Sequence, residues 1–222
     1  MEIIIHRGAK QIGGTCIEIR SDRTRLIFDI GEELPEINKP EKVKTKLSVD
    51  DLFVDSESTD KKIDGIFISH NHGDHIGLFE TVRNDIPVFI GKTALDIQNI
   101  IFDFISKNKK IVPEKILENE TQIQINEFIV TPFLIDHSAC DAYAFLIECD
   151  GKKVIYTGDF RSHGTKGHLT EHFARHPLTQ KPDILLIEGT NIFKHDYVAD
   201  HEDVIGIKAE AFMKKIKRKS VG

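Results

Sequence analysis

The chain has 222 residues, 40% of them hydrophobic, and a formal net charge of −6 at pH 7. This length is sufficient for one domain with a sizeable core. The acidic balance argues against a protein that binds nucleic acid over its whole surface, although a local basic groove is compatible with it. No apolar run approaches the ~18 residues of a membrane span, and the N-terminus lacks a signal-peptide pattern.

Three cysteines, Cys16, Cys140 and Cys149, are spread along the chain. Their odd number and wide spacing argue against a disulfide framework and are typical of proteins of the reducing cytoplasm. We expect all three to be buried free thiols.

The first 31 residues predict three strands joined by short turns, at Glu2 to His6, Thr15 to Arg20 and Thr24 to Asp29. The third strand contains the continuous apolar run 26–28, which is typical of a strand covered on both faces. Asp29 closes this run at a strand end.

Residues 32–60 are polar, with two prolines and many charged side chains. We expect a surface excursion with one short helix near 49–53. Long loops on compact domains are often functional, so the segment is either a lid over a site or an ordinary insertion. We favour the insertion.

Four potential metal ligands follow the apolar run 63–68, and they are His70, His72, Asp74 and His75. His70 and His72 are two apart and point the same way in extended backbone, whereas the adjacent Asp74 and His75 diverge, which suits two ions side by side. Imidazole and carboxylate donors suit zinc and its first-row neighbours. The alternative is a polar surface loop, but this density of ligands after a buried strand favours a metal site.

The next segment predicts a short helix over 78–82, a strand over 88–90 and a longer helix that begins near Thr93. Thr93 and Asp96 resemble a capping pair. Apolar residues at helical spacing predict the face that packs into the core, namely Ile97, Ile100, Ile101, Phe104 and Ile105.

From residue 122 the pattern returns to strands, at Phe128 to Ile135, Ala142 to Cys149, Lys152 to Thr157 and Asp183 to Ile187. Asp150-Gly151 predicts a two-residue hairpin between the second and third of these. Polar motifs follow three strand ends: Asp136-His137-Ser138, Gly158-Asp159-Phe160-Arg161 and Glu188-Gly189-Thr190-Asn191.

The sequence His-x-His-x-Asp-His at 70–75 resembles the hallmark of the metallo-β-lactamase fold, a superfamily of mostly two-metal hydrolases. The three later motifs resemble the β-CASP group of RNA-processing nucleases, which includes the ribonuclease J-like proteins. The resemblance covers residues 1 to about 212. It implies one α/β domain over 1–222, a four-layer αββα sandwich that lacks the β-CASP cap and the C-terminal part, since the chain stops about where the cap would begin.

The resemblance also implies a set of metal ligands. His70, His72 and His137 would hold metal one, Asp74 and His75 would hold metal two, and Asp159 would bridge them. Asp29 would stand behind the site and orient the histidine loop. A strand-end aspartate that caps local amides is the alternative, and the two roles are compatible. A further histidine for metal two is expected late in the chain. His195 and His201 are the candidates and neither fits the pattern well.

The function implied by this resemblance is metal-dependent phosphodiester hydrolysis of RNA, with two divalent ions, zinc or manganese, that activate a water molecule. Asp74 and Glu188 are the catalytic candidates, with Asp74 placed to orient the nucleophile and take its proton. A strand-end carboxylate that caps the next loop is the alternative for Glu188. Ser138 and Arg161 are candidates for holding a substrate anion, or for turn and ion-pair roles.

Two other functions remain open. One is a small-molecule hydrolase of the same fold that acts on an ester, thioester or lactone. The other is a non-catalytic metal-binding module, which the missing ligand favours and the six ligands present oppose. A homodimer is compatible with the sequence, and no membrane partner is expected.

Overall fold

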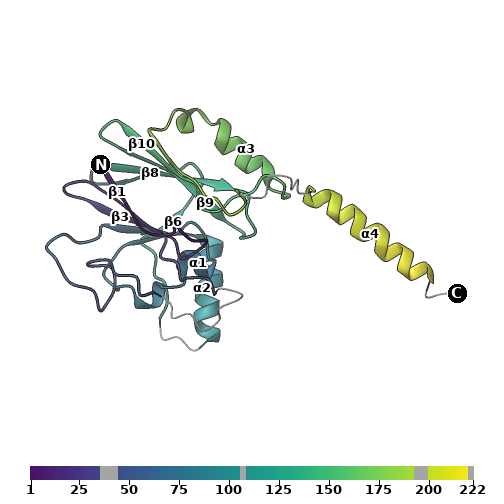
Figure 1. Ribbon diagram of the computed structural model, residues 1–222, viewed down its shortest axis with the longest axis horizontal. Coiled ribbons are helices and arrows are strands. Elements are labelled where there is room, and N and C mark those ends of the chain that lie inside the picture. Colours follow the sequence, from purple (N-terminus) through teal and green to yellow (C-terminus); the bar gives the residue numbers. More distant parts are fainter. Residues whose placement is uncertain (36–44, 106–108, 193–199, 220–222) are drawn as a thin grey trace.

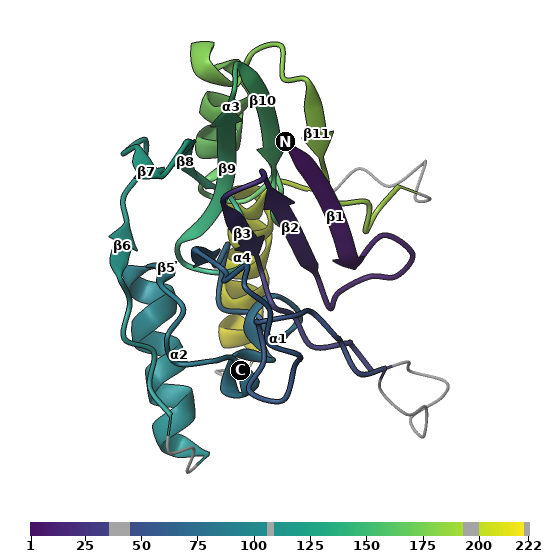
Figure 2. The ribbon, with the colours of Figure 1, turned by 90° about the vertical axis from the view of Figure 1, so that its left-hand side faces the viewer.

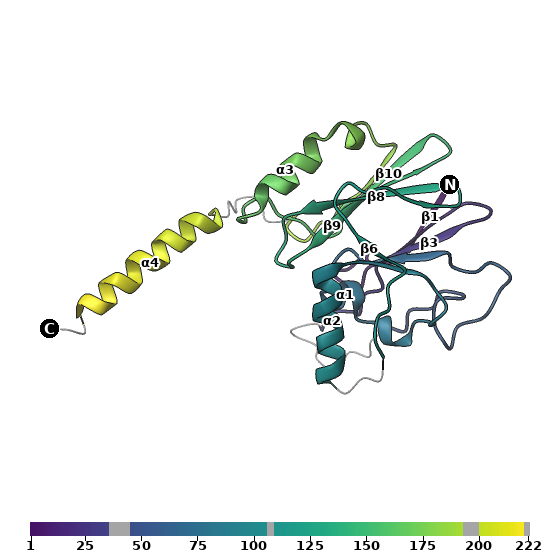
Figure 3. The same ribbon diagram turned by 180° about the vertical axis from the view of Figure 1, so that it is seen from behind.

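The computed structural model describes residues 1–35, 45–105, 109–192 and 200–219. Two β-sheets face each other, and helices cover the outer face of each (Figure 1 and, from behind, Figure 3). This arrangement is the αββα sandwich that the sequence predicts.

The first sheet contains six strands in chain order: β1 (Glu2–Arg7), β2 (Cys16–Arg20), β3 (Arg25–Phe28), β4 (Gly65–Phe67), β5 (Val88–Gly91) and β6 (Lys115–Leu117). The pairs from β1 to β3 are antiparallel, and those from β3 to β6 are parallel. Parallel neighbours end at the same edge of a sheet. Asp29 after β3 and His70 after β4 are therefore brought together.

The second sheet has the order β11-β10-β9-β8-β7. Its strands are β7 (Ile123–Ile125), β8 (Phe128–Ile135), β9 (Ala142–Cys149), β10 (Lys152–Tyr156) and β11 (Ile184–Leu186). β8 and β10 both pair antiparallel with β9, so they end at the same edge, where His137 and Asp159 follow them. Asp150 and Gly151 join β9 to β10 with φ of 52° and 72°, which is the turn that Asp-Gly predicts.

The core between the sheets is built on aromatic rings. Phe67 stacks between Phe28 and Phe89, with ring centroids 5.2 and 4.5 Å away. Phe145 from the second sheet packs edge-on against Phe28 at 5.4 Å. Phe28 is fully buried here while the neighbouring Ile27 packs on the opposite face, so β3 is covered on both faces as predicted.

The helices form the outer layers. α1 (Gly73–Ile76), the 3-10 helix η1 (Phe79–Thr81) and α2 (Lys92–Phe104) belong to the first sheet, and α3 (Gly167–Arg175) and the 3-10 helix η2 (Pro177–Thr179) belong to the second. The last described helix, α4 (Glu202–Lys219), projects away from the sandwich (Figures 1 and 3). No described helix is both long enough and apolar enough to cross a membrane.

The start of α2 differs from the prediction. No side chain next to it in sequence caps the helix, which follows Gly91 directly. The carboxylate of Asp141, in the loop between β8 and β9, accepts hydrogen bonds from the backbone N–H groups of Thr93 at 2.8 Å and Ala94 at 2.9 Å. The predicted Thr93–Asp96 capping pair is therefore wrong, because a residue 48 positions away supplies the cap.

The predicted core face of α2 is also wrong. Phe104 is 88% exposed and Ile100 is 66% exposed. The helix buries a different set, namely Ala94, Leu95, Gln98 and Phe102. The position of α2 on the first sheet decides which helix face is buried. The predicted apolar residues lie mostly to the side of that face.

The excursion over 32–60 is described except for residues 36–44, on which part of the lid prediction falls. The short helix expected near 49–53 is wrong, since this stretch forms turns. Its apolar side chains Leu47, Val49, Leu52 and Phe53 are buried in the cluster beneath the first sheet. The described part of this segment thus belongs to the outer layer.

The three cysteines are free thiols. Cys16 and Cys149 are buried as expected, and Cys140 is exposed, which corrects the prediction for that residue. Cys140 lies in the short loop after β8, where a side chain is not covered by the sheet.

Candidate metal centre

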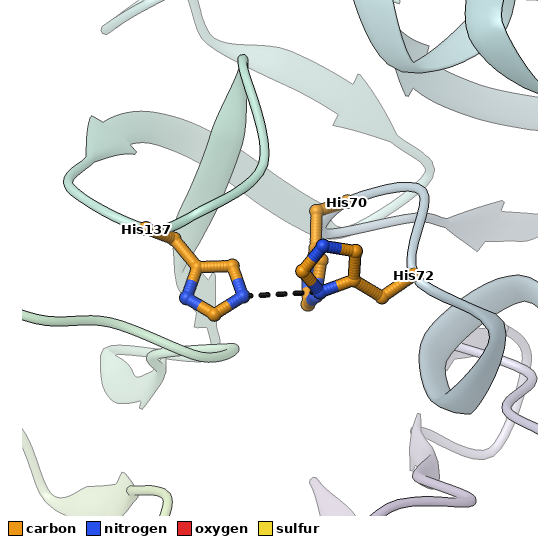
Figure 4. A group of neighbouring side chains, drawn as sticks. All are labelled: His70, His72 and His137. Carbon is orange, nitrogen blue, oxygen red and sulfur yellow. Dashed lines mark hydrogen bonds between the residues drawn. The ribbon is translucent and has the colours of Figure 1, made fainter.

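Three imidazole rings meet beyond the ends of β4 and β8 (Figure 4). His70 Nε2 lies 3.1 Å from His72 Nδ1, which lies 3.2 Å from His137 Nε2. In tetrahedral zinc sites, bonds of about 2.0–2.1 Å hold the ligand nitrogens about 3.3 Å apart. The spacing of these nitrogens therefore fits one ion of this kind.

A second group of donors lies beside the first. His75 Nε2 lies 3.3 Å from Asp159 Oδ1 and 3.8 Å from Asp74 Oδ2. The other carboxylate oxygen of Asp159 lies 4.0 Å from His137 Nε2 in the first group. Each oxygen of Asp159 thus faces a different group, which is the geometry that a bridging carboxylate requires.

The buried carboxylate of Asp29 stands behind both groups. Its Oδ1 accepts from the Ser69 backbone N–H at 2.7 Å. Its Oδ2 accepts from the Ser69 hydroxyl at 2.7 Å, from His75 Nδ1 at 2.7 Å and from the Tyr156 hydroxyl at 2.5 Å. Ser69 Oγ in turn lies 3.0 Å from His70 Nδ1. With both Nδ1 atoms engaged, Nε2 of His70 and of His75 is left to face the donor groups.

The charges at these residues suit a cation. Burial and the neighbouring imidazoles lower the pKa of His70, which is therefore a neutral ring with a lone pair to donate. Burial alone would lower the pKa of His75, but Asp29 and Asp159 outweigh it and raise that pKa to about 10. In the protein without an ion, a proton on His75 offsets the surrounding carboxylates, and a divalent ion can take over this role.

Close backbone packing supports the loop that carries Asp74. The Thr15 N–H donates to the Asp74 carbonyl at 3.0 Å, and Gly31 N–H donates to the Thr15 carbonyl at 2.8 Å. A Cβ at Gly31 would lie 1.7 Å from the Asp74 carbonyl oxygen. Only glycine leaves room for the helix backbone at this position.

The predicted anion-binding residues have other contacts. The guanidinium of Arg161 is held by two carboxylates, with Nε 3.2 Å from Asp136 Oδ1 and Nη1 2.6 Å from Glu202 Oε1. Ser138 is exposed, and its hydroxyl lies 3.5 Å from His137 Nε2. Of the two, Ser138 is the one that borders the donor groups.

Glu188 lies behind the Asp159 loop. Its Oε1 accepts from the Phe160 backbone N–H at 3.0 Å, and its Oε2 accepts from the Thr190 N–H at 3.3 Å. Both carboxylate oxygens of Glu188 therefore accept hydrogen bonds from backbone N–H groups. This contact pattern matches the alternative role, in which Glu188 caps the following loop.

The candidates for a late histidine ligand do not join the centre within the described residues. His195 lies outside the described part of the chain. His201 is exposed at the start of α4, where its Nδ1 lies 3.2 Å from Asp203 Oδ2.

Two supporting residues, Ser69 and Tyr156, are not predicted from the sequence. Tyr156 directly precedes the Thr157-Gly158-Asp159 motif, and its alternation along β10 points its ring into the core between the sheets. Ser69 directly precedes His70. Their proximity to the motifs was the available signal, but a contact between Tyr156 and Asp29, 127 residues apart, requires the fold.

A pocket of about 670 Å³ opens beside the second donor group. It is lined by the loop after β1, by the end of β11 and by Asp74, His75 and Asp159. Figure 2 shows β1 and β11 at the same edge of the molecule, one from each sheet.

Comparison with known families agrees with this geometry. Residues 52–214 match the family described as the beta-lactamase superfamily domain. The chain belongs to this superfamily. Its curated relatives lie in the ribonuclease J-like branch, as the resemblance of the later motifs predicts.

Several of these relatives carry ribonuclease names. Ribonuclease J 2 of Streptococcus pyogenes is 23% identical over 209 residues, which cover 92% of this chain and 37% of the relative. Ribonuclease J of Helicobacter pylori is 30% identical over 161 residues, which cover 69% of this chain and 22% of the relative. The chain thus spans less than half the length of these curated relatives.

Solved structures share the fold of this chain, as two examples show. A protein of unknown function from Enterococcus faecalis V583 aligns with a TM-score of 0.72 and 26% identity, over 89% of this chain and 52% of that one. Zn²⁺-bound PqqB from Methylobacterium extorquens aligns with a TM-score of 0.51 and 16% identity, over 80% of this chain and 58% of that one. The second likeness concerns the fold alone.

Proposed function

We propose that this chain carries the two-metal centre of a hydrolase that cleaves phosphodiester bonds in RNA. The observation that carries the proposal is the placement of Asp159, with Oδ1 3.3 Å from His75 and Oδ2 4.0 Å from His137. Membership of the superfamily supports a metal-dependent hydrolase, and the names of the relatives support RNA as the substrate.

The proposed cofactor is a pair of divalent ions, with zinc preferred and manganese as the alternative. His70, His72 and His137 would hold one ion, Asp74 and His75 would hold the other, and Asp159 would touch both. When bound, such ions lower the pKa of a water molecule and offset negative charge on the attacked phosphorus. Three imidazoles in the first group favour zinc over magnesium or calcium, and PqqB, a neighbour in fold, binds Zn²⁺.

Asp74 is the proposed group that orients the attacking nucleophile and takes its proton. Its carboxylate lines the pocket, is 15% exposed and has one oxygen 3.8 Å from His75 Nε2. A carboxylate in this position lies within reach of both the donor groups and a molecule in the pocket.

Three further residues are given supporting roles in the proposal. The exposed hydroxyl of Ser138 would donate to a phosphate oxygen of the substrate. Glu188 would hold the Asp159–Phe160 turn through its two backbone contacts. Arg161 would brace His137, because its N–H donates to the Asp136 carbonyl at 2.8 Å and its side chain holds the Asp136 carboxylate.

The proposal is tested with two substrates, a single-stranded RNA and the small diester bis(4-nitrophenyl) phosphate, each assayed with added zinc or manganese. We expect both to be hydrolysed, and both activities to be lost in Asp159→Ala and in His70→Ala. His168→Ala is the matched control, since His168 is exposed on α3 and takes no part in the donor groups.

Each result of this assay decides a different part of the proposal. Hydrolysis of the small diester without cleavage of RNA would overturn the RNA assignment and favour a small-molecule hydrolase that uses the pocket of about 670 Å³. No hydrolysis of either substrate by a chain that binds both ions would favour a non-catalytic metal-binding module.

A further inference from the structure

A second cluster of metal-binding side chains lies outside the centre, in the part of the chain that the structure describes. It consists of Glu120, His172 and His176, whose candidate ligand atoms all lie within 4.8 Å of one another. Glu120 belongs to the turn between β6 and β7, His172 to the last turns of α3, and His176 to the position just after that helix.

The geometry of this cluster is that of two rings on one carboxylate. His172 Nε2 lies 2.9 Å from Glu120 Oε1, and His176 Nε2 lies 3.5 Å from Glu120 Oε2. The two rings are four residues apart at the end of one helix, and their centroids are 5.3 Å apart. Each oxygen of Glu120 therefore faces a different imidazole, and one ligand atom from each of the three residues lies within 4.8 Å of the other two.

Two of the three donors are held in place by neighbouring groups, Glu120 by hydrogen bonds and His176 by packing. Glu120 adopts a φ of 60°, with its backbone N–H donating to the Pro132 carbonyl at 2.7 Å, and Asn119 Nδ2 donates to its Oε1 at 3.0 Å. The side chain of His176 is only 17% exposed, and its ring packs 5.0 Å from that of Phe133. His172, 54% exposed, completes the cluster from the solvent side.

Two imidazoles and one carboxylate form a donor set that suits zinc and its first-row neighbours. The Glu120 side chain is a carboxylate and supplies the negative charge of the set. Such a set leaves one or more coordination positions open to water.

We propose that Glu120, His172 and His176 bind a divalent ion of the zinc class that clips the turn at 118–121 to the end of α3. The ion would join segments 52 residues apart in the chain. It would act on stability, because an ion that binds only the folded chain stabilises that state.

One contact indicates weaker binding here than at the centre. The Leu178 backbone N–H donates to His176 Nδ1 at 3.2 Å, so without an ion the proton of this ring is on Nε2, facing Glu120. An ion at Nε2 has to displace this proton to Nδ1, at the cost of the bond from Leu178. At the centre, by contrast, Nδ1 of His70 and His75 is already engaged as a donor.

The test is a calorimetric titration of the full chain with zinc chloride. The proteins are the wild type, His172→Ala, Glu120→Gln and the control His168→Ala, which removes an exposed histidine one turn away on the same helix. We expect the wild type and His168→Ala to take up one weak equivalent of zinc that His172→Ala and Glu120→Gln lack. Zinc should raise the thermal unfolding midpoint in the first pair by more than in the second.

The proposal is independent of the proposed function, and one variant separates the two. Asp159→Ala alters the centre and is expected to retain the weak equivalent. Loss of that equivalent in Asp159→Ala would assign it to the centre and overturn the proposal. An equal number of zinc equivalents in the wild type, His172→Ala and Glu120→Gln would overturn it as well, leaving an ion-pair cluster without a metal.

Discussion

At the scale of single residues, the candidate centre depends on Asp29 as much as on its ligands. A fully buried carboxylate is costly unless its oxygens are satisfied, and Asp29 accepts four hydrogen bonds, from Ser69, His75 and Tyr156. Through Ser69 it also reaches His70. One carboxylate therefore orients a histidine in each of the two donor groups.

This arrangement predicts the effect of Tyr156→Phe. Loss of the hydroxyl leaves Asp29 with one donor fewer, and loss of such supporting contacts lowers metal affinity about 10–100-fold. We also expect a loss of about 1–2 kcal/mol in the free energy of unfolding. Zinc affinity is measured by competition with a chelating dye, and unfolding by circular dichroism in urea.

Tyr143→Phe is the matched control for this prediction. Its hydroxyl is also buried and donates to a backbone carbonyl, that of Leu117, at 3.1 Å. We expect a loss of about 1 kcal/mol in stability with unchanged zinc affinity. Equal zinc affinities for the two variants would show that Tyr156 does not act on the centre through Asp29.

Glu188 gives a second prediction at this scale. If it only holds backbone, Glu188→Gln retains an acceptor for Phe160 and should keep diester hydrolysis within about tenfold of wild type, whereas Glu188→Ala should lose more. If it instead transfers a proton, both variants should lose the contribution of a general acid or base, about 10²–10⁴-fold. Equal losses in the two variants would therefore return Glu188 to a catalytic role.

At the scale of elements, α2 is held to the second sheet through Asp141. The Asp141 carboxylate lies in the loop between β8 and β9 and caps the N-terminus of α2. This contact joins a helix on the first sheet to a loop of the second sheet. We expect Asp141→Ala to lower the free energy of unfolding by about 1 kcal/mol. Asp96→Ala, which removes an exposed ion pair with Lys92 in the same helix, should cost about 0.3 kcal/mol.

Urea unfolding of both variants measures the difference. If Asp96→Ala lowered the free energy of unfolding more than Asp141→Ala, the result would favour the predicted Thr93–Asp96 capping pair over the cap from Asp141.

The pairing of β2 with β1 and β3 contains a buried ion cluster with a defined pH dependence. Glu18 is 1% exposed, and its oxygens contact Arg25 Nε at 2.7 Å and His6 Nε2 at 2.8 Å. Burial raises the pKa of Glu18, but the hydrogen bonds from His6 and Arg25 outweigh it and lower that pKa from 4.5 to about 2. The folded chain thus binds the proton less readily than the unfolded chain.

The stability from Glu18 is therefore present above pH 4.5 and is lost as the pH falls towards 2. A shift of this size corresponds to on the order of 3 kcal/mol. Urea midpoints between pH 7 and pH 2.5 should converge for wild type and Glu18→Gln as the pH falls. The exposed Glu114→Gln should follow wild type throughout, and a constant gap between wild type and Glu18→Gln would contradict this account.

Strands that consist of a long apolar run in the sequence can be predicted from the sequence alone. β8 and β9 have the predicted bounds, because each is a long apolar run closed by a turn or a polar motif. α2 was predicted as a helix, but its cap and its packed face depend on Asp141 and on the position of the first sheet. α3 is short and has only two large apolar side chains, Leu169 and Phe173, so the sequence analysis contains no helix there. Phe173 packs 5.5 Å from Phe133 on the second sheet.

At the scale of the whole molecule, the two sheets meet so that the ends of β3, β4, β8 and β10 lie at one edge. The motifs at 70–75, 136–138 and 158–161 are recognisable in the sequence because each places its potential metal ligands within a few consecutive residues. Other contacts hold these motifs in place, namely Tyr156 to Asp29 and Arg161 to Glu202. These contacts join residues far apart in sequence, so they cannot be predicted without the folded structure.

The central claim is that Asp159 joins two metal sites in this chain. The most direct test is the zinc content by elemental analysis after dialysis. It is measured in the His172→Ala background, so that the proposed ion at Glu120, His172 and His176 does not contribute. We predict two zinc ions per chain, and one or none when Asp159→Ala is added. One ion or fewer in His172→Ala alone, or two ions retained without Asp159, would contradict a two-metal centre bridged by this carboxylate.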